Sequence, residues 1–260
     1  MSKTAIITGA TSGIGAAYAR RLAQEGYDLI ITGRKKEIIQ KLADEVSARN
    51  KVKVNVIIAD FAKEADIQRL LEVLKNKDDI EILINNAGQS GYDRHYEDLD
   101  ITEHEKLVWT HEIAPMRLIS MILPGMIKRR KGIIINVASI ASFLPVTGLS
   151  VYCGVKAFVR LYTQSLYLEL RDKGIKVQAL CPGYTKTNWG KDYFSKRLID
   201  EIPTAKGMTP EKVVECSLSA LRKNKWVCMP GMMNRMMARL FPSLPAGMYY
   251  SMGKRMTPFR

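Results

Sequence analysis

The stretch Gly132-Ile-Ile-Ile-Asn-Val-Ala-Ser139, followed after a loop by Tyr152-Cys-Gly-Val-Lys156, decides how the rest of the chain is arranged. Its three consecutive isoleucines are β-branched and apolar, which predicts a strand buried on both faces, as in the centre of a parallel sheet. Ser139 then falls at or just past the carboxyl end of this strand. Open α/β sheets bind their ligands at that end, so we expect a ligand site here.

Tyr152 and Lys156 are four residues apart, so on a helix they share one face with roughly 5–6 Å between their Cβ atoms. An ammonium group near a phenol favours the phenolate, so we expect Lys156 to lower the pKa of Tyr152 from about 10. Together with Ser139 they form a candidate proton-transfer site. Tyr250 and Lys254 have the same spacing, so the pair alone could equally be a surface tyrosine with a lysine one turn on.

Length and composition indicate one large α/β domain. The chain has 260 residues, of which 47% are apolar and 25% charged, as in ordinary soluble globular proteins. No apolar run is long enough for a transmembrane helix and the N-terminus does not resemble a signal peptide, so we expect a cytoplasmic protein. The four cysteines lack CxxC spacing and matching histidines, so we expect free thiols and no metal.

The net charge of +14 is concentrated near the C-terminus, where residues 216–260 contain eight Lys/Arg, no Asp or Glu, and eight of the 13 methionines. This excess suits an anionic substrate or a phosphorylated cofactor. Nucleic acid is not an expected partner, because the sequence has no basic groove with interleaved aromatic residues and no recognition-helix pattern.

Residues 3–8 predict a first strand, and Gly9-Ala-Thr-Ser-Gly13-Ile-Gly15 opens the following helix. Glycines at this junction allow a tight turn and let a pyrophosphate approach the helix N-terminus. Thr11 and Ser12 can donate hydroxyls to phosphate or cap the helix. The G-xxx-G-x-G spacing differs from the common dinucleotide fingerprint, so a glycine-rich turn that binds nothing remains the alternative.

The second strand, residues 28–32, leads into Gly33-Arg34-Lys35. An acidic residue at this position would select NAD, whereas an arginine accommodates the 2′-phosphate of NADP. Asp28 lies at the wrong end of the strand for this role. Arg34 and Lys35 therefore predict a preference for NADP(H) over NAD(H), unless they are only the solvated start of the next helix.

The remaining pattern continues to alternate strands with helices, which predicts a Rossmann-type doubly wound parallel sheet of about seven strands with helices on both faces. Residues 1–230 form the expected domain, residues 188–208 an expected substrate flap, and residues 231–260 a C-terminal extension. The other expected elements are strand 52–58, helix 63–76, strand 80–84, helix 103–130, strand 132–138, helix 151–172, strand 175–181, helix 209–223 and strand 226–229.

The order of motifs resembles the short-chain dehydrogenase/reductase family over about residues 1–230. The motifs that carry the resemblance are Thr8-Gly9-xxx-Gly13-Ile14-Gly15, Asn85-Asn86-Ala87-Gly88, Ser139 with Tyr152 thirteen residues later and Lys156 four after that, and Pro182-Gly183-xxx-Thr187. Met237 lies thirteen residues before Tyr250, so the second tyrosine–lysine pair does not fit.

The resemblance implies roles for the central residues. Tyr152 would donate a proton to a carbonyl oxygen as a hydride arrives from the nicotinamide. Lys156 would lower the pKa of Tyr152 and hold the nicotinamide ribose, and Ser139 would hydrogen-bond the same carbonyl oxygen. These roles agree with what general acid–base catalysis requires of a tuned tyrosine.

The resemblance also implies a set of cofactor contacts. These are the glycine motif with Thr11, Ser12 and Ile14 at the pyrophosphate, Arg34 and Lys35 at the 2′-phosphate, Asp60 and Phe61 at the adenine, Asn86, Ala87 and Gly88 at the adenine ribose, and Pro182, Gly183, Thr185 and Thr187 at the nicotinamide amide. Beside Ser139, the residues Phe143, Leu144, Tyr184 and Trp189 suggest a fairly apolar substrate.

One position departs from the family. An asparagine usually stands on the long helix and is thought to support a proton relay, but here the position holds His111. The histidine could merely pack in the helix core, replace the asparagine in the relay, or mark a loss of activity.

The C-terminal extension has an amphipathic pattern, with Arg235 and Arg239 on one face and the apolar residues Met232, Met233, Met236, Met237, Leu240 and Phe241 on another. Three roles fit: a subunit-packing helix in a homodimer or homotetramer, a flexible wall of an apolar pocket, or a peripheral membrane contact.

We therefore predict an NADPH-dependent carbonyl reductase that also works in reverse as an alcohol dehydrogenase. A catalytically silent NADP(H) sensor or scaffold is the first alternative, and a membrane-associated reductase of acyl or sterol-like lipids is the second.

Overall fold

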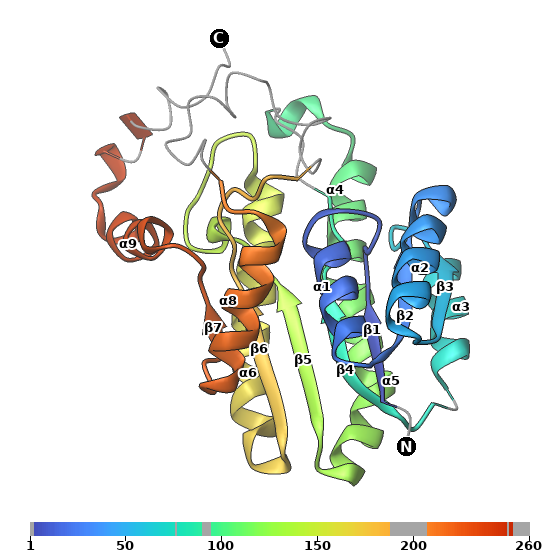
Figure 1. The fold of residues 1–260 in the computed structure, drawn as a ribbon. Coiled ribbons are helices and arrows are strands. Elements are labelled where there is room, and N and C mark those ends of the chain that lie inside the picture. Colours follow the sequence, from blue (N-terminus) through green and yellow to red (C-terminus); the bar gives the residue numbers. More distant parts are fainter. Residues whose placement is uncertain (1–2, 76, 90–94, 188–206, 249, 252–260) are drawn as a thin grey trace.

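The central feature of the computed structural model is a parallel sheet, in which the described residues form seven strands in the order β3-β2-β1-β4-β5-β6-β7 (Figure 1). The structure describes residues 3–75, 77–89, 95–187, 207–248 and 250–251. The strands are β1 (Thr4–Ile7), β2 (Asp28–Gly33), β3 (Val54–Ile58), β4 (Ile80–Asn85), β5 (Gly132–Val137), β6 (Ile175–Leu180) and β7 (Val227–Cys228). The predicted doubly wound sheet is confirmed.

Helices cover both faces of the sheet and complete one domain. The helices α1 (Gly13–Gln24), α2 (Lys36–Asn50) and α8 (Pro210–Arg222) pack on one face through a shared apolar core. The opposite face carries α3 (Glu64–Leu74), α5 (Ala114–Arg129) and α6 (Ser150–Leu170), with a second core beneath them. The predicted element boundaries agree with these within about two residues, the usual uncertainty at helix ends, except in the long helix that contains His111.

The isoleucine run takes the central place that its composition predicts. Strand β5 pairs with β4 on one side and β6 on the other, and Ile134 lies level with Leu83 and Val177. These three side chains are almost completely buried. The strand order reverses between β1 and β4, and sheets of this kind bind ligands at the carboxyl ends of the strands beside such a reversal.

The predicted continuous helix over 103–130 is interrupted, which corrects that expectation. The chain forms α4 (Ile101–Val108), a π-helical turn over Trp109–Ile113, and then α5. Pro115 has no N–H to donate to the carbonyl of His111, four residues earlier, so the regular α-helical hydrogen bond cannot form there. Single π turns often occur at functional sites, and this one contains His111.

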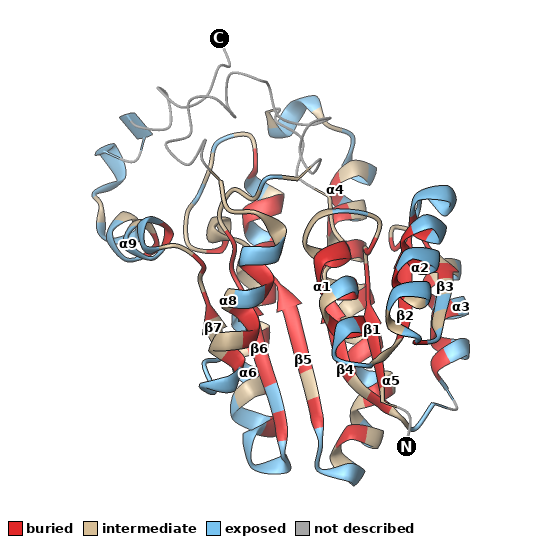
Figure 2. Cartoon of the chain, viewed as in Figure 1, coloured by how far each residue is buried: buried red, intermediate tan, exposed pale blue. Residues whose placement is uncertain are grey.

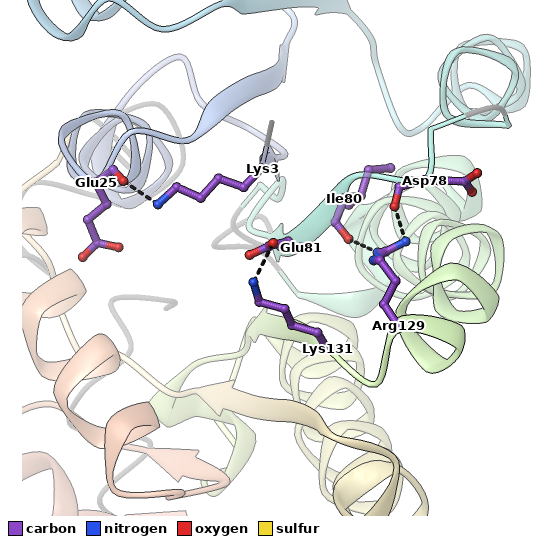
Figure 3. A network of polar contacts seen from close by, with 7 residues as sticks. All are labelled: Lys3, Glu25, Asp78, Ile80, Glu81, Arg129 and Lys131. Carbon is purple, nitrogen blue, oxygen red and sulfur yellow. Dashed lines mark hydrogen bonds and ion pairs between the residues drawn. The ribbon is translucent and has the colours of Figure 1, made fainter. Parts of the chain in front are cut away.

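The basic run Lys128-Arg129-Arg130-Lys131, at the end of α5 and just after it, lies by the amino-terminal end of β4 and serves the fold (Figure 3). The Arg129 guanidinium donates to the backbone carbonyls of Asp78 and Ile80, and Lys131 pairs with Glu81 at 2.8 Å. These cations also lie where the helix dipole favours positive charge. The run therefore stabilises the end of the helix and its contact with β4.

The C-terminal extension begins with α9 (Met232–Leu240), followed by a 3₁₀ turn over Phe241–Ser243. It lies to the side of β7 (Figure 1), and most of its surface is exposed (Figure 2). None of the helices in the described part of the chain is both long and apolar enough to span a bilayer.

Candidate active site

Ser139, Tyr152 and Lys156 come together at the carboxyl end of β5. Ser139 lies two residues beyond the strand, and the other two occupy the first turns of α6. Tyr152 and Lys156 are 4% and 5% exposed. The hydroxyls of Ser139 and Tyr152 are hydrogen-bonded, and Lys156 Nζ donates to the Val137 carbonyl at 2.8 Å while lying 5.7 Å from the Tyr152 ring centroid. The sequence thus identified three side chains that the fold gathers at one point.

The protonation of this cluster differs from the expectation. Burial raises the pKa of Tyr152, and the hydrogen bond from Ser139 only partly opposes this effect. Burial also lowers the pKa of Lys156 to about 7. The pKa of Tyr152 is therefore raised in the protein alone, and the predicted lowering is not found, because desolvation of the buried phenolate is the largest effect on it. The phenol is therefore protonated at neutral pH and can donate a proton.

His111 joins the same cluster from the π turn. Its side chain is 2% exposed, and its ring lies edge-on to that of Tyr152 with 6.0 Å between centroids. Burial, helped by the charge of Lys156, holds the pKa of His111 well below 6.5, so the imidazole is neutral. Nε2 lies 3.0 Å from the Gln89 carbonyl. Because a carbonyl only accepts, Nε2 carries the hydrogen and Nδ1 is an acceptor.

His111 also lines a small cavity, together with Asn85, Asn136 and Val137 among others, and this cavity is large enough for about one water molecule. Asn85 Oδ1 is buried there without a hydrogen-bond partner among the described residues. A water in this cavity could donate to Asn85 Oδ1, and the hydrogen-bonding role of His111 stays a prediction.

A series of hydrogen bonds between buried polar side chains links the site to its strands, and it was not predicted from the sequence. Asn85 Nδ2 donates to Asn136 Oδ1 at 2.8 Å, and Asn136 Nδ2 donates to Thr163 Oγ1 at 2.9 Å. This series joins β4, β5 and α6. The available signal was Asn136 itself, an amide inside an isoleucine run, which can be buried only if it is hydrogen-bonded.

Replacing His111 with asparagine should flatten the pH dependence of stability between pH 7.5 and 5. Below about pH 6.5 His111 binds a proton in the unfolded state but stays neutral in the folded state. Acid therefore stabilises the unfolded state, and the stability of the folded protein falls as the pH drops below this value. Compared with the variant, the natural protein should lose about 2 kcal/mol more of its free energy of unfolding over this range. Urea unfolding at both pH values measures the difference, and equal losses would contradict a neutral His111.

The glycine motif forms a cradle at the start of α1. Gly9 and Gly13 have φ of +67° and +58°, a left-handed conformation that side chains disfavour. A Cβ on Gly15 would lie 2.4 Å from the Gly9 carbonyl oxygen. Ser12 occupies the N-cap position without making a capping hydrogen bond, so its hydroxyl is not used by the helix. These features fit a dinucleotide pyrophosphate, which would sit on the free N–H groups of the helix end.

Asn86 has a task that the sequence did not indicate. Its amide Nδ2 donates to the carbonyls of Thr8 and Gly9, each at 3.0 Å. The backbone N–H groups of Asn86 and Ala87 both donate to Thr8 Oγ1 at 2.9 Å. Both amide hydrogens therefore hold the glycine turn, and the contact of Asn86, Ala87 and Gly88 with the adenine ribose stays a prediction.

The adenine-side residues are placed at the ends of β2 and β3. Arg34 and Lys35 are exposed directly after Gly33, where a phosphate could reach them. Asp60 is half-buried and accepts a hydrogen bond from the Ala62 N–H at 3.2 Å. Phe61 is 4% exposed and its side chain packs in the core, and the contact of Asp60 and Phe61 with adenine stays a prediction.

The expected nicotinamide-side residues follow the carboxyl end of β6. The Pro182 carbonyl accepts from the Ile140 N–H at 2.9 Å, which joins the end of β6 to the loop that carries Ser139. A Cβ on Gly13 would lie 2.8 Å from the Thr187 methyl group, so Thr187 faces the glycine cradle. Thr185 Oγ1 donates to the Gly183 carbonyl.

The expected substrate residues have different environments. Phe143 packs beside Val159 and beneath the Arg160 guanidinium, 4.4 Å from its ring, so it supports the loop after Ser139. Leu144 and Tyr184 are half-buried. Trp189 and most of the expected flap over 188–208 lie outside the described residues.

The fold and this cluster define a class of protein. A family model described as short chain dehydrogenase matches residues 3–198, and the chain belongs to the short-chain dehydrogenase/reductase family. It is therefore an oxidoreductase of a family whose solved members include an enzyme in complex with NADPH.

Similar proteins include reductases of very-long-chain 3-oxoacyl-CoA. The chain is 33% identical over 247 residues to a very-long-chain 3-oxoacyl-CoA reductase of Anas platyrhynchos, covering 93% of this chain and 75% of that protein. The human enzyme of the same name is 28% identical over 256 residues, covering 96% and 78%.

Two solved structures are similar over nearly the whole chain. A short-chain dehydrogenase from Sphingobium yanoikuyae in complex with NADPH has a TM-score of 0.82 at 30% identity, covering 99% of this chain and 96% of that one. A bulky-bulky ketone specific alcohol dehydrogenase from Comamonas testosteroni has a TM-score of 0.79 at 30% identity, covering 99% and 95%.

Proposed function

We propose that this protein uses NADPH to reduce the ketone of a 3-oxoacyl thioester with a long apolar chain, with Tyr152 as the general acid. The observation that carries the proposal is the buried, protonated Tyr152, hydrogen-bonded to Ser139 and adjacent to Lys156. The relatives that reduce very-long-chain 3-oxoacyl-CoA and the bulky-ketone dehydrogenase support the substrate class.

NADPH, held by the glycine cradle, Arg34 and Thr187, would supply a hydride to the carbonyl carbon. Side chains of the protein would act on the carbonyl oxygen of the substrate. The Ser139 hydroxyl would donate a hydrogen bond to it, and Tyr152 would transfer its phenolic proton as negative charge develops there. Lys156, whose pKa of about 7 lets it exchange protons at neutral pH, would hold the nicotinamide ribose and stabilise the phenolate that forms.

The test is a carbonyl panel followed by NADPH absorbance: 3-oxoacyl-CoA esters of increasing length, bulky aromatic ketones and short ketones. The proposal expects kcat/KM to rise with acyl length, because burying one methylene is worth about 0.8 kcal/mol, or roughly fourfold. A preference for short ketones would contradict the substrate class. Cofactor binding without turnover of any carbonyl would support a silent NADP(H) sensor. That alternative is suggested by His111, which stands where the family usually has an asparagine.

Replacing Arg34 with alanine should weaken NADPH binding by roughly 10- to 100-fold, because a charge-assisted hydrogen bond to phosphate contributes about 1.5–3 kcal/mol. NADH binding should change little, so the ratio of the two dissociation constants is the measurement. Lys36→Ala is the matched control, since Lys36 is an exposed cation at the first position of α2, two residues after Arg34. An unchanged ratio in Arg34→Ala would disprove the role of Arg34.

A further inference from the structure

Helix α9 is attached to the protein by one side only. Asn234 and Ala238, four residues apart, are its buried positions among the described residues. Asn234 Nδ2 donates to the Pro230 carbonyl at 2.7 Å, and a Cβ on Gly183 would lie 2.4 Å from the Asn234 amide. These contacts fix α9 beside Gly183, at the end of β6 and next to the candidate active site.

The opposite side of α9 is an apolar stripe that faces solvent. Met232, Met236 and Leu240 recur every four residues and are 80%, 48% and 57% exposed, with Met233 beside them at 52%. Figure 2 shows this outward face as exposed. Contiguous apolar side chains on a protein surface usually mark an interaction site. Their exposure also argues against the expected pocket wall, because the stripe points away from the protein body.

The positive charges beside the stripe indicate a partner with negative charge. Arg235 and Arg239 are both exposed and, from their spacing on the helix, run along one edge of the stripe. The whole segment 216–260 contains no acidic residue. An apolar helix face bordered by arginines matches the boundary between the acyl chains and the phosphate groups of an anionic bilayer.

A second copy of α9 matches this surface less well. In a twofold interface the same patch lies on both subunits, so Arg235 and Arg239 would approach their own counterparts. Since residues 216–260 provide no carboxylate to pair with them, the charges would repel. A lipid surface supplies the missing negative charge.

We propose that α9 docks the protein on anionic membranes, with Met232, Met236 and Leu240 among the acyl chains and Arg235 and Arg239 at the lipid phosphates. Docking at this position would hold the end of β6 and the candidate active site close to the bilayer surface. The proposal concerns binding and holds whether or not the protein reduces acyl thioesters.

Sedimentation of the full-length protein with phosphatidylcholine vesicles, with and without 30% phosphatidylserine, tests the proposal. We expect binding to the anionic vesicles, reduced at least tenfold in the triple variant M232Q/M236Q/L240Q. R235Q/R239Q should lose roughly fivefold for each arginine and become less sensitive to salt. All substituted side chains are exposed, and circular dichroism checks that the variants remain folded.

Two matched variants control for hydrophobicity and charge. Ile38→Gln removes an exposed apolar side chain from α2, and K223Q/K225Q removes two exposed cations from the same acid-free segment outside α9. Both should bind vesicles like the natural protein. Absence of vesicle binding, or equal binding by the stripe variant, would overturn the proposal. So would a stripe variant that loses only self-association, measured by sedimentation velocity, because α9 would then pack against a second copy.

Discussion

Replacing Tyr152 with phenylalanine should lower kcat/KM for carbonyl reduction by about three orders of magnitude, the middle of the range for loss of a general acid. The substitution removes one oxygen and keeps the ring. The ring packs against Leu149 and Cys153, so the fold and the edge-on contact with His111 should persist. The measurement is NADPH oxidation with the best substrate from the carbonyl panel.

A loss of proton transfer must be separated from a loss of binding. The dissociation constant of NADPH, followed by fluorescence titration, should change by less than about threefold, because cofactor binding relies mainly on the glycine cradle and Arg34. Tyr250→Phe is the matched control. Tyr250 has the same spacing to a lysine but is 67% exposed, so that variant should retain full activity. Full activity in Tyr152→Phe would disprove the proposed mechanism.

The sequence was sufficient for the parts of the fold that repeat a strong local pattern. Three isoleucines in a row predicted the central strand, and glycines between a strand and a helix predicted the turn at Gly9. Both predictions depend on the local sequence alone. A buried strand needs apolar side chains on both faces, and a left-handed φ favours glycine.

Features that depend on distant neighbours were not predictable in this way. The spacing of Tyr152 and Lys156 fixes their separation but not their burial, and burial determines the direction of both pKa shifts. The use of Asn86 as a support for the Gly9 turn depends on strand order, which brings residues 77 positions apart within 3.0 Å. The interruption at His111 could have been suspected from Pro115, because a proline inside a helix removes a hydrogen bond.

The pair Gly15→Ala and Gly154→Ala tests the cradle with one chemical change at two helical positions. A Cβ on Gly15 would lie 2.4 Å from the Gly9 carbonyl oxygen and 2.6 Å from Asn86 Nδ2, whereas a Cβ on Gly154 meets nothing within 4 Å. The backbone of Gly15 does not have a positive φ, so the effect of alanine there is a steric one. The Gly9 turn must shift, and the hydrogen bonds from Asn86 that hold it must lengthen.

Gly15→Ala should therefore weaken NADPH binding by roughly 100-fold and lower the free energy of unfolding by about 1–3 kcal/mol, the usual cost of overpacking. Gly154→Ala should leave NADPH binding unchanged and raise stability by about 0.5–1 kcal/mol, because alanine restricts the unfolded chain. Fluorescence titration and urea unfolding measure both quantities. Normal NADPH affinity in Gly15→Ala would show that the turn can shift without harm, and the close packing of Gly9 and Gly15 would then not be what shapes the cofactor site.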